Sequence, residues 1–497
     1  MSTVAIVGGG FSGTMVAAHL LRRGLRGRVL LVERHGPFSG GVAYGTRCRA
    51  HSLNVPAGRM SAFADDEDHF LAWMRRREPG TTGASFVPRL AFGHYLRQVL
   101  AEAEADAPSW TELERIPGEA VGLEPLAAGG IQVRLADGRR LASDVTILAV
   151  GNFPPATPAL ADPSGLASPR YAPDPWAHDA LDVDADDPVL LVGTGLTMID
   201  VVLGLVEQQH RGPIYAVSRR GLLPQPHRQS AVPPPHYPRP RDLDEWPRTA
   251  SGLVRALRRE VLEATCEGHD WREVLASIRA DTPAMWASLD ERARARLLRH
   301  LRPYWETHRH RAAPAPWAGV QATIDTGQLD VRAARLLGMR PVDGAMEVAL
   351  RGRGGADVER LRVGRVINCT GPDTDLSRVR EPLIVALREV GMLRPDAFGL
   401  GLDTDGDGAL LDAAGRASDR LFLVGPLRKG RLWENTAVPE LRVEAAALAE
   451  RLAMRLATTA PPAGNGRMKP APRDQAAGMR SAMPFERARA GVRRTFG

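Results

Sequence analysis

Cysteine is scarce in this chain of 497 residues, in which only Cys48, Cys266 and Cys369 occur. Three cysteines are too few for a disulfide scaffold, and no Cys-x-x-Cys pair is present to act as a local redox dithiol. The three lie far apart in the sequence, so we interpret them as buried or incidental thiols.

Long apolar runs are missing as well. The longest run near the N-terminus, residues 15–21, is too short to span a bilayer and contains His19. The first residues lack the basic segment of a signal peptide, and the glycines at positions 8–10 would interrupt its apolar helix. The sequence therefore predicts no membrane partner and a cytoplasmic location.

Lysine is nearly absent, because 63 of the 65 basic residues are arginine. The net charge of +7 and the pI near 9.8 are typical of nucleic-acid-binding proteins. Residues 458–497, however, hold a net charge of +6 and have no periodicity, so we predict a disordered basic tail there. The rest of the chain is nearly neutral, and we expect no nucleic-acid partner. Salt-sensitive DNA retention by the tail is the alternative.

The first segment predicts a strand, a glycine turn and a helix. Residues 3–7 form a short apolar run, and residues 11–23 have the spacing of an amphipathic helix. The motif Gly8-x-Gly10-x-x-Gly13 stands between them. Its glycines permit a tight turn, the approach of a pyrophosphate and close packing of helix on strand, while the helix N-terminus favours phosphate charge.

A second apolar run follows at residues 28–32 and ends at Glu33. This acid stands about 20 residues after the glycine motif, where a dinucleotide-binding fold places the residue that binds the ribose. Strand, motif, helix and acid together favour a dinucleotide site over a merely structural glycine turn.

A second unit, residues 188–217, repeats the arrangement with Gly193-x-Gly195-x-x-Met198. Met198 replaces the third glycine. Because that glycine serves the packing of helix on strand, its absence makes the helix packing uncertain but does not argue against phosphate binding. Ser218, Arg219 and Arg220 end its second strand, where an acid would favour NAD. Arginines there favour the 2′-phosphate of NADPH, unless they are solvated surface charges.

Two such units indicate an α/β protein with two Rossmann-like domains. The simplest interpretation places FAD in the first and NADPH or NADH in the second. A protein that holds one nucleotide, or a degenerate repeat, is the alternative. We predict an FAD domain formed by residues 1–180 and 341–457. A nicotinamide domain with a helical insertion occupies residues 186–340 between them.

Several short motifs carry a resemblance over residues 1–457. In this order they resemble two-dinucleotide-binding flavoproteins, and most of all the bacterial FAD/NAD(P)-binding monooxygenase family that includes a urate hydroxylase and amino-acid N-hydroxylases. The motifs are Gly8-Gly9-Gly10-Phe11-Ser12-Gly13, Gly41-Val42-Ala43-Tyr44-Gly45-Thr46, Leu53-Asn54-Val55-Pro56-Ala57-Gly58-Arg59-Met60, Leu191-Val192-Gly193-Thr194-Gly195, Ser218-Arg219-Arg220-Gly221, Asn368-Cys369-Thr370-Gly371-Pro372 and Val438-Pro439-Glu440-Leu441-Arg442.

The resemblance implies roles for these segments. Residues 44–46 and 54–60 resemble loops that close over the flavin, and residues 368–372 the turn where the chain returns from the nicotinamide domain. Residues 425–439 resemble the ribityl segment, and the N-terminus of the following helix would face the isoalloxazine. The further cofactor residues so implied are Phe11, Ser12, Tyr44, Thr46, Asn54, Arg59, Gly371 and Gly425. For Thr46 and Asn54, a local turn hydrogen bond is an equal alternative.

The absence of a redox dithiol argues against a disulfide reductase. A monooxygenase needs no protein nucleophile, because reduced flavin and O₂ form a flavin hydroperoxide that transfers one oxygen to a small polar substrate. By resemblance we expect urate hydroxylation in purine catabolism, with N-hydroxylation of an aspartate-like amino acid as the alternative. A non-catalytic nucleotide-binding or redox-sensing flavoprotein is a further one. The sequence assigns no catalytic side chain and no oligomeric state.

Other polar residues carry less information. His308 and His310 are two positions apart, which does not place them on one helix face, and no carboxylate completes a metal set. We expect packing or solvated roles for the histidines, with these two retained as substrate-pocket candidates. Four charged residues of the predicted flavin loop either bind an anionic substrate or are exposed: Arg428, Lys429, Arg431 and Glu434.

Overall fold

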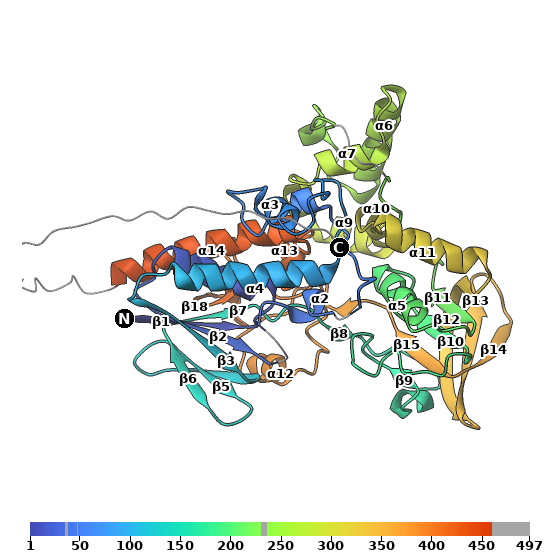
Figure 1. Ribbon diagram of the computed structural model, residues 1–497, viewed down its shortest axis with the longest axis horizontal. Coiled ribbons are helices and arrows are strands. Elements are labelled where there is room, and N and C mark those ends of the chain that lie inside the picture. The colour runs from blue at the N-terminus through green and yellow to red at the C-terminus, as the bar shows by residue number, and fades with distance from the viewer. Residues whose placement is uncertain (35–37, 47, 230–235, 460–497) are drawn as a thin grey trace, which may run out of the picture. The chain divides into compact units, whose positions relative to one another are not determined.

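The computed structural model describes residues 1–34, 38–46, 48–229 and 236–459 (Figure 1). They form the expected α/β structure, with two large sheets that consist mainly of parallel strands. The predicted basic tail lies outside the described residues from position 460 on.

The first large sheet has the strand order β17-β18-β7-β1-β2-β3. Its apolar strands pair in parallel, with Val4 of β1 beside Val29 and Val145, and only β17 runs antiparallel to its neighbour. The strands are β1 (Ser2–Val7), β2 (Gly27–Glu33), β3 (Thr111–Pro117), β7 (Val145–Leu148), β17 (Ala409–Leu411) and β18 (Ala417–Leu423).

Helices from both ends of the chain cover one face of this sheet. Helix α1 (Phe11–Arg22) packs against α4 (Arg89–Ala105) and α14 (Val438–Thr459), and their apolar sides form one core with the sheet (Figure 1). The other face carries α12 (Pro382–Glu389) and a smaller sheet of β4 (Ala120–Pro125), β5 (Ile131–Leu135) and β6 (Arg140–Ser143).

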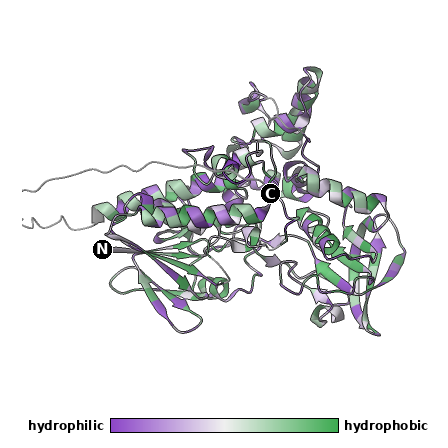
Figure 2. Ribbon diagram, in the orientation of Figure 1, coloured by the Kyte–Doolittle hydropathy of each residue, from purple (hydrophilic) through white to green (hydrophobic). Residues whose placement is uncertain are grey.

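The second large sheet has the order β14-β13-β12-β11-β10-β15-β9. Helices α5 (Leu196–Glu207) and α11 (Pro314–Asp325) cover one face, and Figure 2 shows that α5 and the strands beneath it are mostly hydrophobic. The strands are β9 (Tyr171–Ala172), β10 (Val189–Val192), β11 (Ile214–Ser218), β12 (Leu329–Val342), β13 (Ala345–Gly352), β14 (Val358–Val363) and β15 (Arg365–Asn368).

This sheet changes the predicted domain boundaries. The strands within residues 345–368, assigned above to the second part of the FAD domain, belong to this second large sheet instead, as do residues 171–172. The reason is that β12 continues past residue 340 and folds back as an antiparallel meander before β15 enters the sheet next to β10. The sequence shows these strands but not the sheet that they join.

The helical insertion contains α6 (Ala250–Cys266), α7 (Trp271–Ser277), α8 (Thr282–Ala287), α9 (Glu291–His300) and α10 (Arg302–Arg309). The side chains of Thr249, Asp270 and Asp290 cap three of these helices. Trp286 is buried and stacks on Trp433 at a ring distance of 4.6 Å, so the insertion packs against the segment that precedes α14.

Short elements complete the described chain. They are α2 (Gly41–Tyr44), α3 (His69–Arg75), α13 (Lys429–Leu432), β8 (Phe153–Pro155), β16 (Pro372–Asp373) and the 3₁₀ turns at Ala57–Arg59, Ser164–Ala167, Leu243–Glu245 and Pro426–Arg428. Strands β8 and β16 pair with each other next to the crossings between the large sheets. Among the described helices, none combines the length and apolar character that crossing a bilayer requires.

Candidate active site

The first glycine loop joins β1 to α1 with the backbone that its motif requires. Gly8 has a φ of +112°, and a Cβ there would lie 2.2 Å from the carbonyl oxygen of Ala149. A Cβ on Gly13 would lie 1.9 Å from the carbonyl oxygen of Gly8, so helix and strand pack too closely for a side chain. The residue before α1, Gly10, offers no side-chain cap, which leaves the first amides of the helix for an anion.

Glu33 lies beside this loop. It ends β2, and its Oε2 accepts a hydrogen bond of 2.7 Å from the backbone N–H of Gly9. The acid is therefore held next to the glycine turn, as the spacing predicted. Its contact with a ribose stays a prediction.

The segment before residue 46 lies over the same loop. A Cβ on Gly41 would lie 3.1 Å from the Cα of Gly10, and Tyr44 packs edge-on against Phe92 at 4.7 Å. Burial raises the pKa of the Tyr44 hydroxyl to about 12. The Thr46 hydroxyl bonds to His51 Nδ1 (2.8 Å) and accepts from the backbone N–H at position 48 (3.2 Å), which favours the local-turn alternative for this residue.

Gly425 comes to the first loop from the other end of the chain. Its φ is +109°, and a Cβ there would lie 3.2 Å from the Ser12 hydroxyl oxygen. Glu444, buried and paired with Arg428 at 2.7 Å, accepts from the Gly425 N–H, and Asn435 donates to the Gly425 carbonyl. Gly10, Ser12 and Gly425 thus line one glycine-walled cradle without protruding side chains, which fits a bound dinucleotide pyrophosphate.

The second glycine loop repeats this geometry between β10 and α5. Gly193 has a φ of +117°, and a Cβ there would lie 2.3 Å from the Cys369 carbonyl oxygen, while Gly195 faces open space. Met198 is fully buried in the core beneath α5, so the missing third glycine does not prevent helix packing. Gly371, with φ +83°, turns the chain next to this loop after β15.

Residues 218–220 lie at the end of β11, which is the strand position that the sequence predicted for them. The Ser218 hydroxyl accepts from Thr194 Oγ1 (2.8 Å) and from the Gly221 N–H (3.0 Å), which ties it to the glycine loop. Arg219 is exposed, and Arg220 lies 5.1 Å over the ring of Tyr304. Within the described residues neither guanidinium pairs with a carboxylate, so both remain available to a 2′-phosphate.

Asn54 lies where the two dinucleotide domains meet. Its carbonyl oxygen contacts Nε2 of His227 at 3.0 Å, and its side chain lines a narrow pocket beside the start of α5. Nearby, Arg89 and Asp200 form a buried ion pair of 2.8 Å between the domains. Burial raises the pKa of Asp200, and burial lowers the pKa of His227 to about 3, so this imidazole is neutral at pH 7.

The three thiols differ in exposure, since Cys48 is half-buried and Cys266 is exposed. Cys369 is buried, Cys48 donates to Glu207 at 2.7 Å, and all three cysteines are free. His308 packs edge-on against Trp271 at 5.0 Å. Burial lowers the pKa of His310 to about 4. No group of three or more potential metal ligands occurs in the part of the chain that the structure describes.

Sequence reasoning missed an arginine cluster at the start of α14, which we define as Arg59, Arg279, Arg309 and Arg311 with Glu434 and Glu440. Arg279 binds Glu440 through two nitrogens, one at 2.6 Å, and Arg309 binds Glu434 at 2.8 Å. Glu434 also accepts from Trp305 Nε1 at 2.7 Å. These residues come from four distant segments, and among them only Arg59, Glu434 and Glu440 belong to motifs singled out in the sequence.

The remaining arginines of the cluster have no carboxylate of their own. Within the described residues, Arg59 and Arg311 form no ion pair, and the buried Nε of Arg311 has no hydrogen-bond partner. Burial and the neighbouring Arg309 lower the pKa of Arg311 to about 10, and burial and Arg279 lower the pKa of Arg59. The cluster contains four guanidinium groups and two carboxylates, so it has an excess of two positive charges. Arg442 and Glu67, which form an ion pair of 2.8 Å nearby, do not change this excess.

For the four charged residues of the predicted flavin loop, the sequence left two alternatives open, binding of an anionic substrate or exposure to solvent. Arg428, Lys429 and Glu434 are all buried and paired, the first with Glu444 and the second with Glu306 at 3.4 Å. Burial lowers the pKa of the Lys429 ammonium. Arg431 alone of the four is exposed. The loop therefore connects the cradle at Gly425 to the arginine cluster through Glu434 and Asn435.

The chain is similar to known proteins in sequence and in fold. Residues 5–153 match the model of the FAD-NAD(P)-binding family. A nitrosuccinic acid synthase, npaA, of Aspergillus oryzae is 26% identical over 222 residues, which are 40% of this chain and 34% of that protein. An L-aspartate N-monooxygenase (nitrosuccinate-forming) of Streptomyces cremeus is 34% identical over 177 residues, 34% of this chain and 26% of that protein. The matched parts thus span about a third and a quarter of these relatives.

The fold has a solved counterpart. The reduced form of the ornithine hydroxylase PvdA from Pseudomonas aeruginosa superposes with a TM-score of 0.61 at 16% identity, covering 92% of this chain and all of that one. At this identity the likeness concerns the fold. Residues 5–153 thus match the FAD-NAD(P)-binding family model, and the fold of the chain resembles that of the ornithine hydroxylase.

Proposed function

We propose that this protein is an FAD- and NAD(P)H-dependent monooxygenase that N-hydroxylates a small acidic amino acid of the aspartate type. The observation that carries the substrate class is the arginine cluster, which has two more positive than negative charges beside the segment that leads to the flavin cradle. The two relatives with matching sequence segments, a nitrosuccinic acid synthase and an L-aspartate N-monooxygenase, support the same substrate class.

An excess of two charges suits a substrate with two carboxylates. Arg279 and Arg309 are oriented by their glutamates, whereas Arg59 and Arg311 have guanidinium groups left for the ligand. Guanidinium and carboxylate form bidentate, charge-assisted hydrogen bonds, which also fix the orientation of the bound molecule. A cationic substrate such as ornithine would be repelled by the same groups.

The cluster also favours the reactive form of the amine. N-hydroxylation requires a neutral amine, whereas the ammonium form of an amino acid dominates in water. Positive charges near an ammonium group lower its pKa, because they disfavour the charged form. Arg59 and Arg311 would therefore bind the carboxylates and, at the same time, promote loss of a proton from the amine next to them.

The two glycine loops supply the cofactor sites in this proposal. The cradle of Gly10, Ser12 and Gly425 would hold the FAD pyrophosphate, and the loop at Gly193 and Gly195 the pyrophosphate of the nicotinamide cofactor. FAD supplies hydride acceptance and O₂ activation when bound. Arg219 and Arg220 would bind the 2′-phosphate and so select NADPH.

Urate hydroxylation, the first expectation from the motifs, is replaced by its alternative. One relative with matching sequence is named as an L-aspartate N-monooxygenase and the other as a nitrosuccinic acid synthase, and the arginine cluster favours a dicarboxylate. A non-catalytic flavoprotein is the second class, and it predicts no substrate-dependent oxidation of NADPH.

The test is direct. The FAD-loaded protein is mixed with NADPH and O₂, and NADPH oxidation is followed with L-aspartate, urate and L-ornithine in parallel. Products are identified by mass spectrometry as a gain of oxygen on nitrogen. We expect stimulation and a hydroxylated product with L-aspartate. Oxidised urate, or no product from any of the three, would contradict the proposal.

A further inference from the structure

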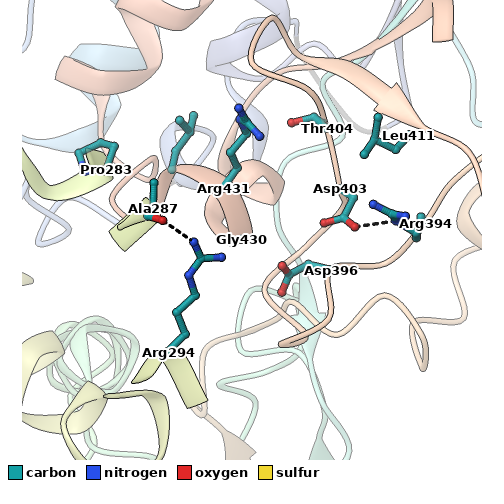
Figure 3. A pocket seen from close by; sticks show the side chains of 11 residues that line it. Pro283, Ala287, Arg294, Arg394, Asp396, Asp403, Thr404, Leu411, Gly430 and Arg431 are labelled. Atoms are coloured by element: carbon teal, nitrogen blue, oxygen red, sulfur yellow. Dashed lines mark hydrogen bonds and ion pairs between the residues drawn. The ribbon is translucent and has the colours of Figure 1, made fainter. Parts of the chain in front are cut away.

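A separate cavity of about 530 Å³ lies where the helical insertion meets the segments 394–411 and 430–432 (Figure 3). Its volume is within the range that small-molecule sites occupy. Three lining residues, Gly430, Arg431 and Leu432, belong to the segment 425–439 that resembles the flavin ribityl segment. The other lining residues lie outside the predicted cofactor motifs, and none of the glycine-loop residues or arginine-cluster residues lines the cavity.

Charged side chains from three segments face this cavity. Arg394 and Asp403 neutralise each other in an ion pair of 2.7 Å (Figure 3). Arg294 comes from α9 and donates to the carbonyl oxygens of Trp286 (3.2 Å) and Ala287 (2.9 Å) rather than to a carboxylate. Arg431 is exposed and, within the described residues, has no hydrogen-bond or ion-pair partner.

The acidic and hydroxyl groups of the cavity form no ion pair or hydrogen bond with Arg294 or Arg431 in the described structure. Asp396 uses one oxygen to accept from the backbone N–H groups of Phe398 (2.8 Å) and Leu400 (3.1 Å). Burial and the nearby Asp403 raise the pKa of Asp396, and the positive charge of Arg294 acts in the opposite direction. The buried Thr404 hydroxyl accepts from Arg428 at 3.2 Å, so its own proton remains for an acceptor in the cavity.

We propose that this cavity is a second ligand site, which binds a small anion with a carboxylate or phosphate group. Arg294 and Arg431 pair with the anion, and the Thr404 hydroxyl donates to it. Arginine suits both groups because its fork of N–H donors matches two oxygens at once. With three guanidiniums against two carboxylates, a singly charged anion neutralises the lining.

The cavity touches the segment that leads to the arginine cluster. Its wall includes Gly430 and Leu432 of α13, and Trp286 donates to the Gly430 carbonyl at 2.7 Å. Trp433 follows with a φ of +56°, a left-handed backbone that is uncommon for a bulky residue, and Glu434 comes next. An anion held by Arg431 therefore restrains α13, which ends two residues before Glu434, the partner of Arg309.

Titration calorimetry on the FAD-loaded protein tests the proposal, with inorganic phosphate and succinate as separate probes at constant ionic strength. The variants are Arg431→Gln and Arg294→Gln. Arg255→Gln is the matched control, since that arginine is exposed on α6 and lies outside the cavity. Arg311→Gln reports binding at the arginine cluster instead. Flavin content and circular dichroism confirm folding of each variant.

We expect at least one probe to bind, and each cavity variant to weaken its binding by about tenfold or more, as loss of a charge-assisted hydrogen bond predicts. Phosphate binding alone would identify a phosphate ligand, and succinate binding alone a carboxylate. The control and Arg311→Gln should leave this binding unchanged. Absence of binding by both probes, or binding that only Arg311→Gln weakens, would overturn the proposal. Neither result depends on catalytic turnover.

Discussion

Arg311 is the residue on which the proposed substrate class can be tested most sharply. It is a guanidinium without an ion-pair partner in the described structure, its Nε is buried, and its nearest charged neighbours include Arg309 and Arg272. An unpaired buried charge destabilises a folded protein unless a ligand compensates for it. Substitution of Arg311 by Gln should therefore have opposite effects on stability and on substrate binding.

The magnitudes follow from the same features. A hydrogen bond to a charged group contributes about 1.5–3 kcal/mol, and each 1.36 kcal/mol is a factor of ten, so KM for L-aspartate should rise by about 10- to 150-fold. The pKa of Arg311 falls from 12.5 to about 10 on folding. Since the pKa is lowered, the charged form is disfavoured at every pH below about 10, and relief of this cost would stabilise the free protein by about 1–3 kcal/mol at pH 7.

Steady-state kinetics and urea unfolding of the substrate-free protein measure both effects, with Arg255→Gln as the control. KM for NADPH should stay the same, because Arg311 lies outside both glycine loops. A loss of stability together with an unchanged KM for L-aspartate would refute the reasoning, since it would show that Arg311 is a structural residue compensated within the protein itself.

The remaining predictions concern the cofactors and pH. Gly10→Ala should fold normally but lose FAD, because a Cβ there is 3.8 Å from its nearest neighbour and projects into the cradle. Gly13→Ala should lower the melting temperature as well, because its Cβ would overlap the Gly8 carbonyl oxygen. If Gly10→Ala and the wild type contain equal amounts of flavin, the FAD site is misplaced. Replacing Arg219 and Arg220 together by Ala should raise KM for NADPH about tenfold or more and leave KM for NADH nearly unchanged, and equal effects on both would exclude 2′-phosphate binding. Burial lowers the pKa of His19 from 6.5 to about 4, so the unfolded chain binds the extra proton between these values and stability falls as the pH drops through them. Between pH 7 and pH 5, the free energy of unfolding measured in urea should therefore fall by about 2 kcal/mol less in His19→Leu than in the wild type. Parallel pH profiles of the two proteins would contradict a neutral, buried His19 ring.

Local patterns predicted the positions of the two glycine turns, because each turn is encoded largely by neighbouring residues. Gly13 is required by its contact with Gly8 in the same strand-turn-helix unit, and Glu33 ends the strand that follows. Gly8 has a positive φ in its own turn, although the carbonyl that a side chain there would meet belongs to the distant Ala149. The same locality explains the prediction for the second loop. Even there, the consequence of Met198 needed the structure, which shows its side chain accommodated in the core under α5.

Long-range pairing was not accessible in this way. The meander from β12 to β14 has the alternating pattern of a strand in either domain, and only the pairing of β12 with β11 assigns it to the second large sheet. The arginine cluster was hidden for a similar reason. Arginine is the common basic residue throughout this chain, so no local excess marks the four that converge.

The arrangement of these four arginines explains why two glutamates belong in an anion site. Glu440 lies in the first turn of α14, and Glu434 lies shortly before that helix begins. A negative charge in the first turn is stabilised by the helix dipole, and each glutamate fixes one guanidinium in place. Because Arg279 and Arg309 are already fixed, they add positive potential without competing for orientation, while Arg59 and Arg311 remain unpaired for the ligand. Removing either glutamate would then increase the positive charge but release an arginine, so we expect weaker binding of L-aspartate despite the stronger field.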